Sequence, residues 1–153
     1  MKLATLCYVQ ENGCTLMLHR NTRPDDFHLD KWNGLGGKLQ AGESPEEGVR
    51  REVFEESGLA LRSLRMRGVI TFPQFDGRDD WYVFVFTAER ASGELRDSSE
   101  GHLEWIPDAS LLDLNLWPGD RVFLPWIREE SFFSAKFTYR NKEFIGHEVH
   151  FYA

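Results

Sequence analysis

The chain has 153 residues, of which 41% are hydrophobic and 14% aromatic, and these proportions predict one compact domain over residues 1–153. Its formal net charge of −7 disfavours nonspecific binding to polymeric nucleic acid. No segment approaches the roughly 18 apolar residues of a membrane span. We therefore expect a cytoplasmic protein with neither a membrane nor a nucleic acid as partner. Two cysteines, Cys7 and Cys14, are too few for a disulfide framework or a zinc site.

The first part of the chain predicts a hairpin and then a polar loop. Residues 3–9 and 15–19 are strand-like, and the Gln-Glu-Asn-Gly sequence between them is typical of a hairpin turn. Residues 21–31 are expected to form a loop. Residues 32–39, Trp-Asn-Gly-Leu-Gly-Gly-Lys-Leu, lead from it into a helix.

That helix is predicted from about residue 45 to residue 57. Ser44 is a favourable N-cap, Pro45 suits the first helical position, and Glu47 completes a capping box. Gly58 is typical of a C-terminal stop.

Three glutamates converge along one side of the predicted helix. Val49 and Val53 form its apolar stripe at i, i+4. At about 100° per residue, Glu52 and Glu56 lie beside this stripe, and Glu55 lies on the same flank. Carboxylates this close repel one another, and a hard divalent cation with oxygen ligands relieves the repulsion.

The alternative is a solvated acidic helix in which Glu47 pairs with Arg51 at i, i+4. That interpretation explains neither the glycines before the helix nor the acids beside the apolar stripe. Residues 43–56 contain six Glu and two Arg, so an anionic substrate would be repelled without bound cations. The sequence therefore predicts metal dependence.

The rest of the chain predicts further strands and a second helix. The strand-like stretches are 64–75, 81–89, 101–106, 133–139 and 143–152. Residues 111–120 are expected to be a loop, and 121–129 a helix bent near Pro125. This mixture of strands with two helices predicts an α/β fold.

The motif from Gly37 to Leu59 resembles the Nudix box. Five residues separate Gly37 from Glu43, and seven more precede the Arg-Glu-Val sequence at 51–53. The Glu-Glu pair, the glycine and the leucine that follow also have the family's spacing. The resemblance implies a mixed β-sheet sandwiched between α-helices, and an enzyme that cleaves a nucleoside diphosphate linked to another group. It also implies Mg²⁺ as cofactor, with Mn²⁺ as the alternative.

The resemblance assigns roles within the motif. It implies that Glu52, Glu55 and Glu56 bind the metal, with the Gly36 carbonyl nearby. It implies that Arg51 orients these glutamates, with a surface position as the alternative. Glu43 is expected to support the site from its loop.

A further catalytic residue is expected outside the motif. Glu100 lies in a polar Ser-Ser-Glu-Gly loop, where the resemblance implies a glutamate that binds metal or takes the proton from the attacking water. Glu104 is the other candidate nearby for this role. The alternative is that Glu100 is a loop acid without a catalytic role. Glu52, Glu56 and Glu100 all remain candidates for the general base.

Two flanking segments are similar to the MutT-type oxidised-purine nucleoside triphosphatases, namely Trp-Asn-Gly-Leu-Gly-Gly-Lys at 32–38 and Trp-Pro-Gly-Asp at 117–120. This narrower resemblance implies release of pyrophosphate from 8-oxo-dGTP and sanitation of the nucleotide pool. The alternatives are another Nudix substrate (ADP-ribose, a dinucleoside polyphosphate or an ordinary nucleotide) and a noncatalytic nucleotide-sensing module.

A purine pocket needs a flat aromatic face and a few polar groups for the base edge. Trp117 is expected to supply the face, with core packing as the alternative. Asn33 offers a donor and an acceptor, or is a turn residue. Asp120 can accept, can donate if burial keeps it protonated, or is simply a helix N-cap. Phe72 is expected to line the pocket.

Arg20 and Lys38 are expected to contact phosphates, with solvated positions as the alternative. The resemblance is strongest to the animal members of this group, which carry two adjacent acids where this chain has Gly119-Asp120. The loop between Arg20 and Trp32 is also longer in this chain. The five histidines show no metal-ligand spacing, and no chemistry is assigned to them. A monomer or a weak homodimer is expected.

Overall fold

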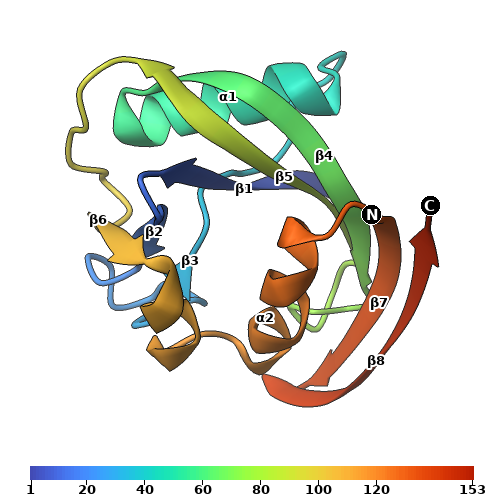
Figure 1. Ribbon diagram of the computed structural model, residues 1–153. Coiled ribbons are helices and arrows are strands. Elements are labelled where there is room, and N and C mark those ends of the chain that lie inside the picture. The colour runs from blue at the N-terminus through green and yellow to red at the C-terminus, as the bar shows by residue number, and fades with distance from the viewer.

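A computed structural model describes all residues from Met1 to Ala153. Eight strands form one sheet in the order β3-β2-β1-β5-β4-β7-β8, with β6 paired to β2 (Figure 1). The strands are β1 (Lys2–Glu11), β2 (Cys14–His19), β3 (Trp32–Asn33), β4 (Ala60–Phe72), β5 (Trp81–Ser92), β6 (His102–Pro107), β7 (Phe132–Arg140) and β8 (Glu143–Tyr152).

The sheet is mixed. Strand β1 runs parallel to β5, and β4 runs parallel to β7, whereas the other neighbouring pairs are antiparallel. Strands β1 and β2 pair only next to their connecting turn, at Gln10–Thr15 and Glu11–Cys14. Strand β2 therefore diverges from β1, and Figure 1 shows β2, β3 and β6 set apart from the layer of β1, β5 and β4.

Helix α1 (Pro45–Ser57) begins and ends as its sequence predicts. The Ser44 hydroxyl accepts from the Glu47 N–H at 3.0 Å, and the Glu47 carboxylate accepts from the Ser44 N–H at 2.9 Å. Gly58 ends the helix in the left-handed conformation, with φ of 81°. Because Glu47 caps the helix, it is not the partner of Arg51, and the alternative ion pair is wrong.

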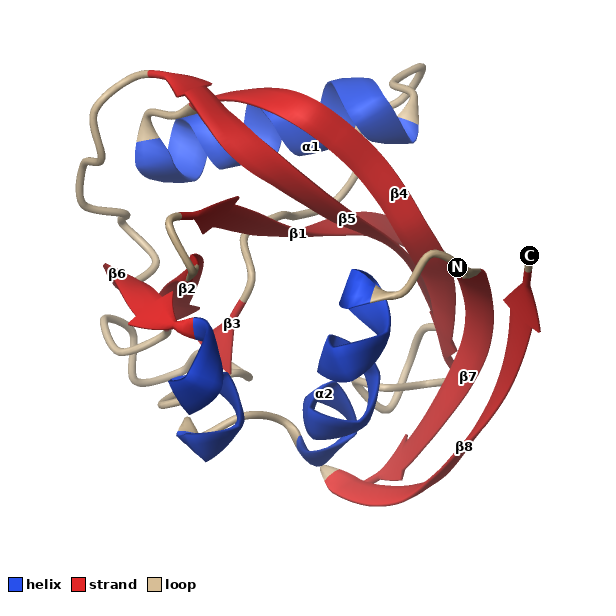
Figure 2. Cartoon of the chain, viewed as in Figure 1, coloured by secondary structure: helices blue, strands red, loops and turns tan.

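The sheet has a hydrophobic core on each face, because successive residues of a strand point to opposite sides. Cys7 packs with Val49 and Val53 of α1, whereas the adjacent Tyr8 packs with Phe123 on the other face. That second face is covered by η1 (Asp108–Asp113), α2 (Pro118–Phe123) and η2 (Leu124–Arg128). Figure 2 shows α1 on one side of β1 and α2 on the other. The predicted α/β fold with a sheet between helices is confirmed.

Several predicted boundaries are wrong. The expected loop at 111–120 overlaps η1, and the expected helix at 121–129 is instead α2 from Pro118 followed by the 3-10 helix η2. Pro125 has no N–H for a continuing α-helix, which explains the change of helix type. Strand β4 covers 60–72 rather than 64–75, and its register shifts between Arg62 and Arg65 interrupt the alternation on which the prediction depended. None of the helices combines the length and the apolar composition that a membrane span requires.

Candidate active site

The segment that precedes α1 is fixed along strand β1. Cys7 and Leu35 exchange backbone hydrogen bonds of 2.6 and 3.0 Å, and the Thr5 N–H donates to the Gly37 carbonyl at 2.9 Å. The Gly36 N–H donates to Oε1 of Glu56 at 2.8 Å. The loop is thereby tied both to the sheet and to the glutamate face of α1.

Two glycines are required where this loop passes between strand and helix. A Cβ on Gly36 would collide with the Thr5 carbonyl, and its φ is +152°. A Cβ on Gly37 would lie 2.6 Å from the carboxylate of Glu52. The absence of side chains at these positions lets the Glu52 carboxylate lie directly against the loop backbone.

Negative charge accumulates around Glu56. Burial raises the pKa of the Glu56 carboxyl to about 8, against the opposing hydrogen bond from Gly36, and the charges of Glu52 and Glu100 add to the increase. One other glutamate of α1 and one glutamate from a distant loop therefore act on the same carboxyl group.

Arg51 connects the acids of the motif. Its Nε donates to Glu43 at 2.6 Å, and its Nη1 donates to Glu52 at 2.8 Å and to Glu55 at 3.3 Å. The pKa of Glu43 is lowered to about 2, first by the hydrogen bond from Arg51 and then by the N–H of Gln40. Glu55 is 57% exposed, and its only ion pair is with Arg51.

Glu100 lies beside two arginines. Its Oε2 is 3.0 Å from Nη2 of Arg20 and 3.4 Å from Nη2 of Arg23. Arg20 also donates to both carboxylate oxygens of Asp26, at 2.8 and 3.0 Å. Glu104 instead pairs with His102 at 3.1 Å on an exposed stretch of β6, away from this cluster.

The donor set fits a hard divalent cation. The groups around Glu56 are carboxylates, and the backbone of Gly36 lies against them, so the available ligands are oxygen atoms. Burial and the like charges of Glu52 and Glu100 raise the pKa of Glu56, and a bound cation would oppose that increase. No three acidic, histidine or cysteine side chains converge closely enough to hold an ion as they stand. Arg51 pairs with Glu52 and Arg20 pairs with Glu100.

A cavity of about 370 Å³ begins at this loop and extends across the sheet. Gly36 and Gly37 form part of its wall, so it reaches the backbone that contacts Glu56 and Glu52. The six predicted substrate residues all line it: Arg20, Asn33, Lys38, Phe72, Trp117 and Asp120.

Two polar groups in this cavity lack partners within the chain. The Asn33 Nδ2 is buried without a hydrogen bond. Asp120 is 7% exposed, and burial raises the pKa of its carboxyl to about 7, against the charges of Lys31 and Arg121. Asp120 is the third residue of α2, and Trp117 is the N-cap without a side-chain bond. The alternative that Asp120 caps this helix is therefore wrong.

Trp117 belongs both to the core and to the cavity wall. It is 5% exposed, and the Phe27 ring lies nearly parallel to it, with centroids 5.6 Å apart. Its Nε1 donates to Nδ1 of His28 at 2.9 Å. Burial lowers the pKa of His28 to about 4, so this imidazole is neutral and can accept that bond. A base that enters here meets Phe27 as well as Trp117.

Several cavity residues were not predicted from the sequence: Phe27, His28, Phe75 and Tyr139. Phe27 and His28 come from the loop at 21–31, whose greater length was the only signal. Phe75 follows β4 in the turn that was assigned to a strand. Tyr139 comes from β7, and nothing in its local sequence distinguishes it from a core residue.

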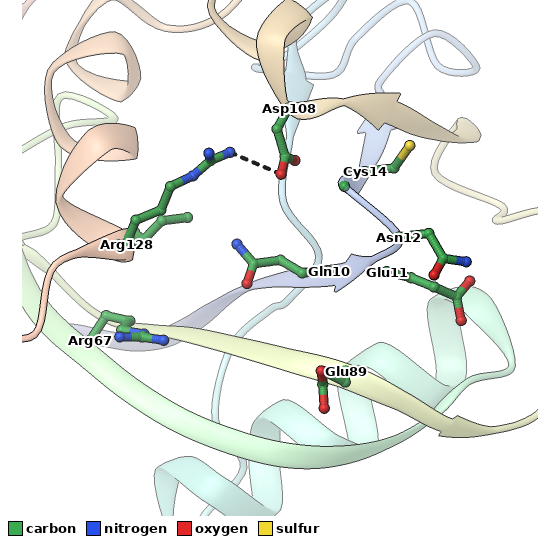
Figure 3. Close-up of a pocket in the computed structure, with 10 residues that line it drawn as sticks. Gln10, Glu11, Asn12, Cys14, Arg67, Glu89, Asp108 and Arg128 are labelled. Atoms are coloured by element: carbon green, nitrogen blue, oxygen red, sulfur yellow. Dashed lines mark ion pairs between the residues drawn. The ribbon is translucent and has the colours of Figure 1, made fainter.

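A second cavity, of about 410 Å³, lies at the other end of β1, beside the turn between β1 and β2 (Figure 3). Its wall is mainly polar, and across it Arg128 pairs with Asp108 at 3.2 Å. None of the predicted site residues lines it.

Known proteins resemble this chain over most of its length. The NUDIX domain matches residues 2–127. The oxidized purine nucleoside triphosphate hydrolase of Mus musculus is 32% identical over 78% of this chain and 76% of its own length. Its counterpart from Danio rerio is 32% identical over 97% of this chain and 90% of its own length.

A solved structure gives the same result. The MutT protein of Bacillus halodurans superposes with a TM-score of 0.85 at 28% identity, covering 97% of each chain. The family match includes the loop, the glutamate helix and the cavity residues up to α2. The chain therefore belongs to the Nudix hydrolase family.

Proposed function

We propose that this chain is a Mg²⁺-dependent pyrophosphohydrolase of oxidised purine nucleoside triphosphates, with 8-oxo-dGTP first among its substrates. The products are the nucleoside monophosphate and pyrophosphate. The observation that carries the proposal is the continuity of one cavity, which has unpartnered polar groups of Asn33 and Asp120 in its wall and the glutamate-backed loop at Gly36 and Gly37. The two relatives of this chain that are named oxidized purine nucleoside triphosphate hydrolases support the proposed substrate class.

Base recognition follows from the chemistry of these two side chains. Guanine presents N7 as an acceptor, whereas an 8-oxo base carries an N–H there and an additional carbonyl at C8. The Asn33 amide can both donate and accept. Asp120, with a pKa of about 7, is able to accept when ionised and to donate when protonated. Phe72, Phe27 and Trp117 supply apolar and aromatic surface beside them.

Metal binding is assigned to oxygen ligands next to the loop. Glu52, Glu56 and Glu100 would hold Mg²⁺ together with the Gly36 carbonyl, and Glu55 would join them by turning from Arg51; Mn²⁺ is the alternative ion. When bound, the ion neutralises phosphate charge and lowers the pKa of a coordinated water.

The remaining steps belong to side chains of the chain itself. Arg51 holds Glu52 in place, and it holds Glu55 until that carboxylate turns to the metal. One of Glu52, Glu56 and Glu100 takes the proton from the attacking water. Lys38 and Arg20 contact the phosphates, which requires Arg20 to leave Glu100.

The cellular role proposed is sanitation of the nucleotide pool, which places the enzyme in the cytoplasm with its substrate. A nucleotide is its partner, and no polymeric nucleic acid or membrane is required. The proposed oligomeric state is a monomer or a weak homodimer.

Pyrophosphate release from a nucleotide panel tests the proposal. The panel contains 8-oxo-dGTP, dGTP, dATP, ADP-ribose and a dinucleoside polyphosphate, each with Mg²⁺. We expect the highest kcat/KM for 8-oxo-dGTP. A higher value for ADP-ribose or the dinucleoside polyphosphate would assign the enzyme to another Nudix substrate, and binding without turnover of any compound would indicate a sensing module.

A further inference from the structure

Tyr139, which lines the cavity, is closely fitted against Gly119. The Gly119 N–H donates to the Tyr139 hydroxyl oxygen at 2.7 Å. A Cβ on Gly119 would lie 2.7 Å from that same oxygen and 2.5 Å from Cδ2 of Phe137, which is fully buried. The tyrosine hydroxyl therefore fills the space that a side chain at position 119 would enter.

The direction of this bond leaves the tyrosine proton free. A backbone N–H can only donate, so the Tyr139 oxygen is the acceptor, and no group of the chain accepts the hydroxyl proton. Tyr139 lines the cavity together with Asp120. Burial raises the pKa of the Tyr139 hydroxyl, and the charge of Asp120 adds to the increase, so the group keeps its proton at neutral pH.

We propose that Tyr139 is a specificity-determining residue whose hydroxyl donates a hydrogen bond to a carbonyl oxygen of the oxidised purine. This inference rests on the proposed function. The animal enzymes that the chain resembles have an acid immediately before Asp120, and an acid can accept or donate according to its protonation. This chain has Gly119 at that position instead. The Tyr139 hydroxyl, a donor, lies where a side chain at position 119 would be. The free hydroxyl donor therefore favours a base that presents a carbonyl oxygen to Tyr139 over one that presents an amino group there.

The test uses Tyr139→Phe, which removes the hydroxyl and keeps the ring. Values of kcat/KM are measured for 8-oxo-dGTP, whose base has carbonyl groups at C6 and C8, and for dATP, whose base has an amino group at C6 and no carbonyl group. We expect the ratio of the two values to fall by roughly three- to tenfold, as for the loss of one hydrogen bond. Tyr152→Phe is the matched control, because Tyr152 is 57% exposed on β8, and it should leave the ratio unchanged.

A second measurement separates recognition from structural support. The variant also loses the acceptor for the Gly119 N–H, and a purely structural role would lower both kcat/KM values in equal proportion. Binding of 8-oxo-dGMP in the presence of chelator reads the base contact without hydrolysis, and Tyr139→Phe should weaken it by a similar factor.

The outcomes distinguish this inference from the proposed function. If the parent prefers 8-oxo-dGTP and Tyr139→Phe leaves both the ratio and 8-oxo-dGMP binding unchanged, the role of Tyr139 is refuted and the function stands. An equal loss on both substrates also refutes it. If the parent shows no preference for 8-oxo-dGTP, the proposed function fails, and the inference fails with it.

Discussion

Asp120→Asn tests whether a buried carboxyl group in the cavity is protonated near neutral pH. Its pKa rises from 3.8 to about 7 because of burial, and at 7% exposure little solvent screens the charge. One pKa unit corresponds to about 1.36 kcal/mol, so ionised Asp120 lowers the free energy of unfolding by up to about 4 kcal/mol. Asparagine has nearly the same shape and never ionises, so the variant lacks this penalty.

The sign of the pH effect follows from the raised pKa. Asp120 contributes its full stability below pH 3.8, where both the folded and the unfolded forms are protonated, and loses it as the pH rises through about 7. Roughly 3 kcal/mol of the loss falls between about pH 5 and pH 8. For a chain of this size, the Tm of the parent should fall relative to that of Asp120→Asn by roughly 5–10 °C over this interval.

Thermal unfolding of both proteins at the two pH values, followed by circular dichroism, measures this difference. Other groups that titrate in the interval, such as Glu56, are present in both proteins and cancel. The same Tm difference at both pH values would refute the raised pKa of Asp120.

Steady-state kinetics test whether Asp120 also recognises the base. Asp120→Ala should lower kcat/KM for 8-oxo-dGTP about tenfold or more beyond its effect on dGTP, because a buried charged or protonated acid makes a strong hydrogen bond. Asp120→Asn should lose less, since its amide can still donate. An equal effect of Asp120→Ala on both nucleotides would mean that the residue does not read the base.

Three further perturbations address the metal site and the aromatic wall. Glu56→Gln should reduce kcat by about a hundredfold or more, and turnover within about threefold of the parent would remove Glu56 from the mechanism. The same variant should raise the Tm in chelator near pH 8, because the parent carboxylate is buried among like charges. Magnesium should raise the Tm of the parent near pH 8 by binding the native state, and equal midpoints with Mg²⁺ and with chelator would argue against the metal site. Trp117→Ala should destabilise the fold by about 3–5 kcal/mol and should reduce kcat/KM for 8-oxo-dGTP and dGTP alike; a selective effect on one of them would give Trp117 a part in reading the base edge.

Local sequence predicted those elements whose ends depend on short-range chemistry. The capping box at Ser44 determines the first residue of α1, and the left-handed Gly58 determines its last. The Val49–Val53 stripe determines which face of the helix is buried. The region around Pro118 was harder to predict. There the chain changes from a 3-10 helix to an α-helix and back within a few residues, and packing rather than periodicity decides where each one ends.

The same distinction applies to the candidate site. Glu52 and Glu56 could be placed together from helical spacing alone. The approach of Glu100, and the two arginines beside it, depend on how β6 and the loop at 21–31 pack, which no local pattern encodes. The Phe27 and His28 contacts with Trp117 are long-range for the same reason. The Tyr139 hydroxyl reaches Gly119 only because β7 passes beside α2.

The most direct test of the account is product analysis on 8-oxo-dGTP by ³¹P NMR, with Mg²⁺ and then with excess chelator. The account predicts that the parent forms pyrophosphate and 8-oxo-dGMP with Mg²⁺, that chelator abolishes the pyrophosphate signal, and that Glu56→Gln slows its appearance by about a hundredfold or more. Release of orthophosphate, turnover that persists in chelator, or no turnover of 8-oxo-dGTP would contradict it.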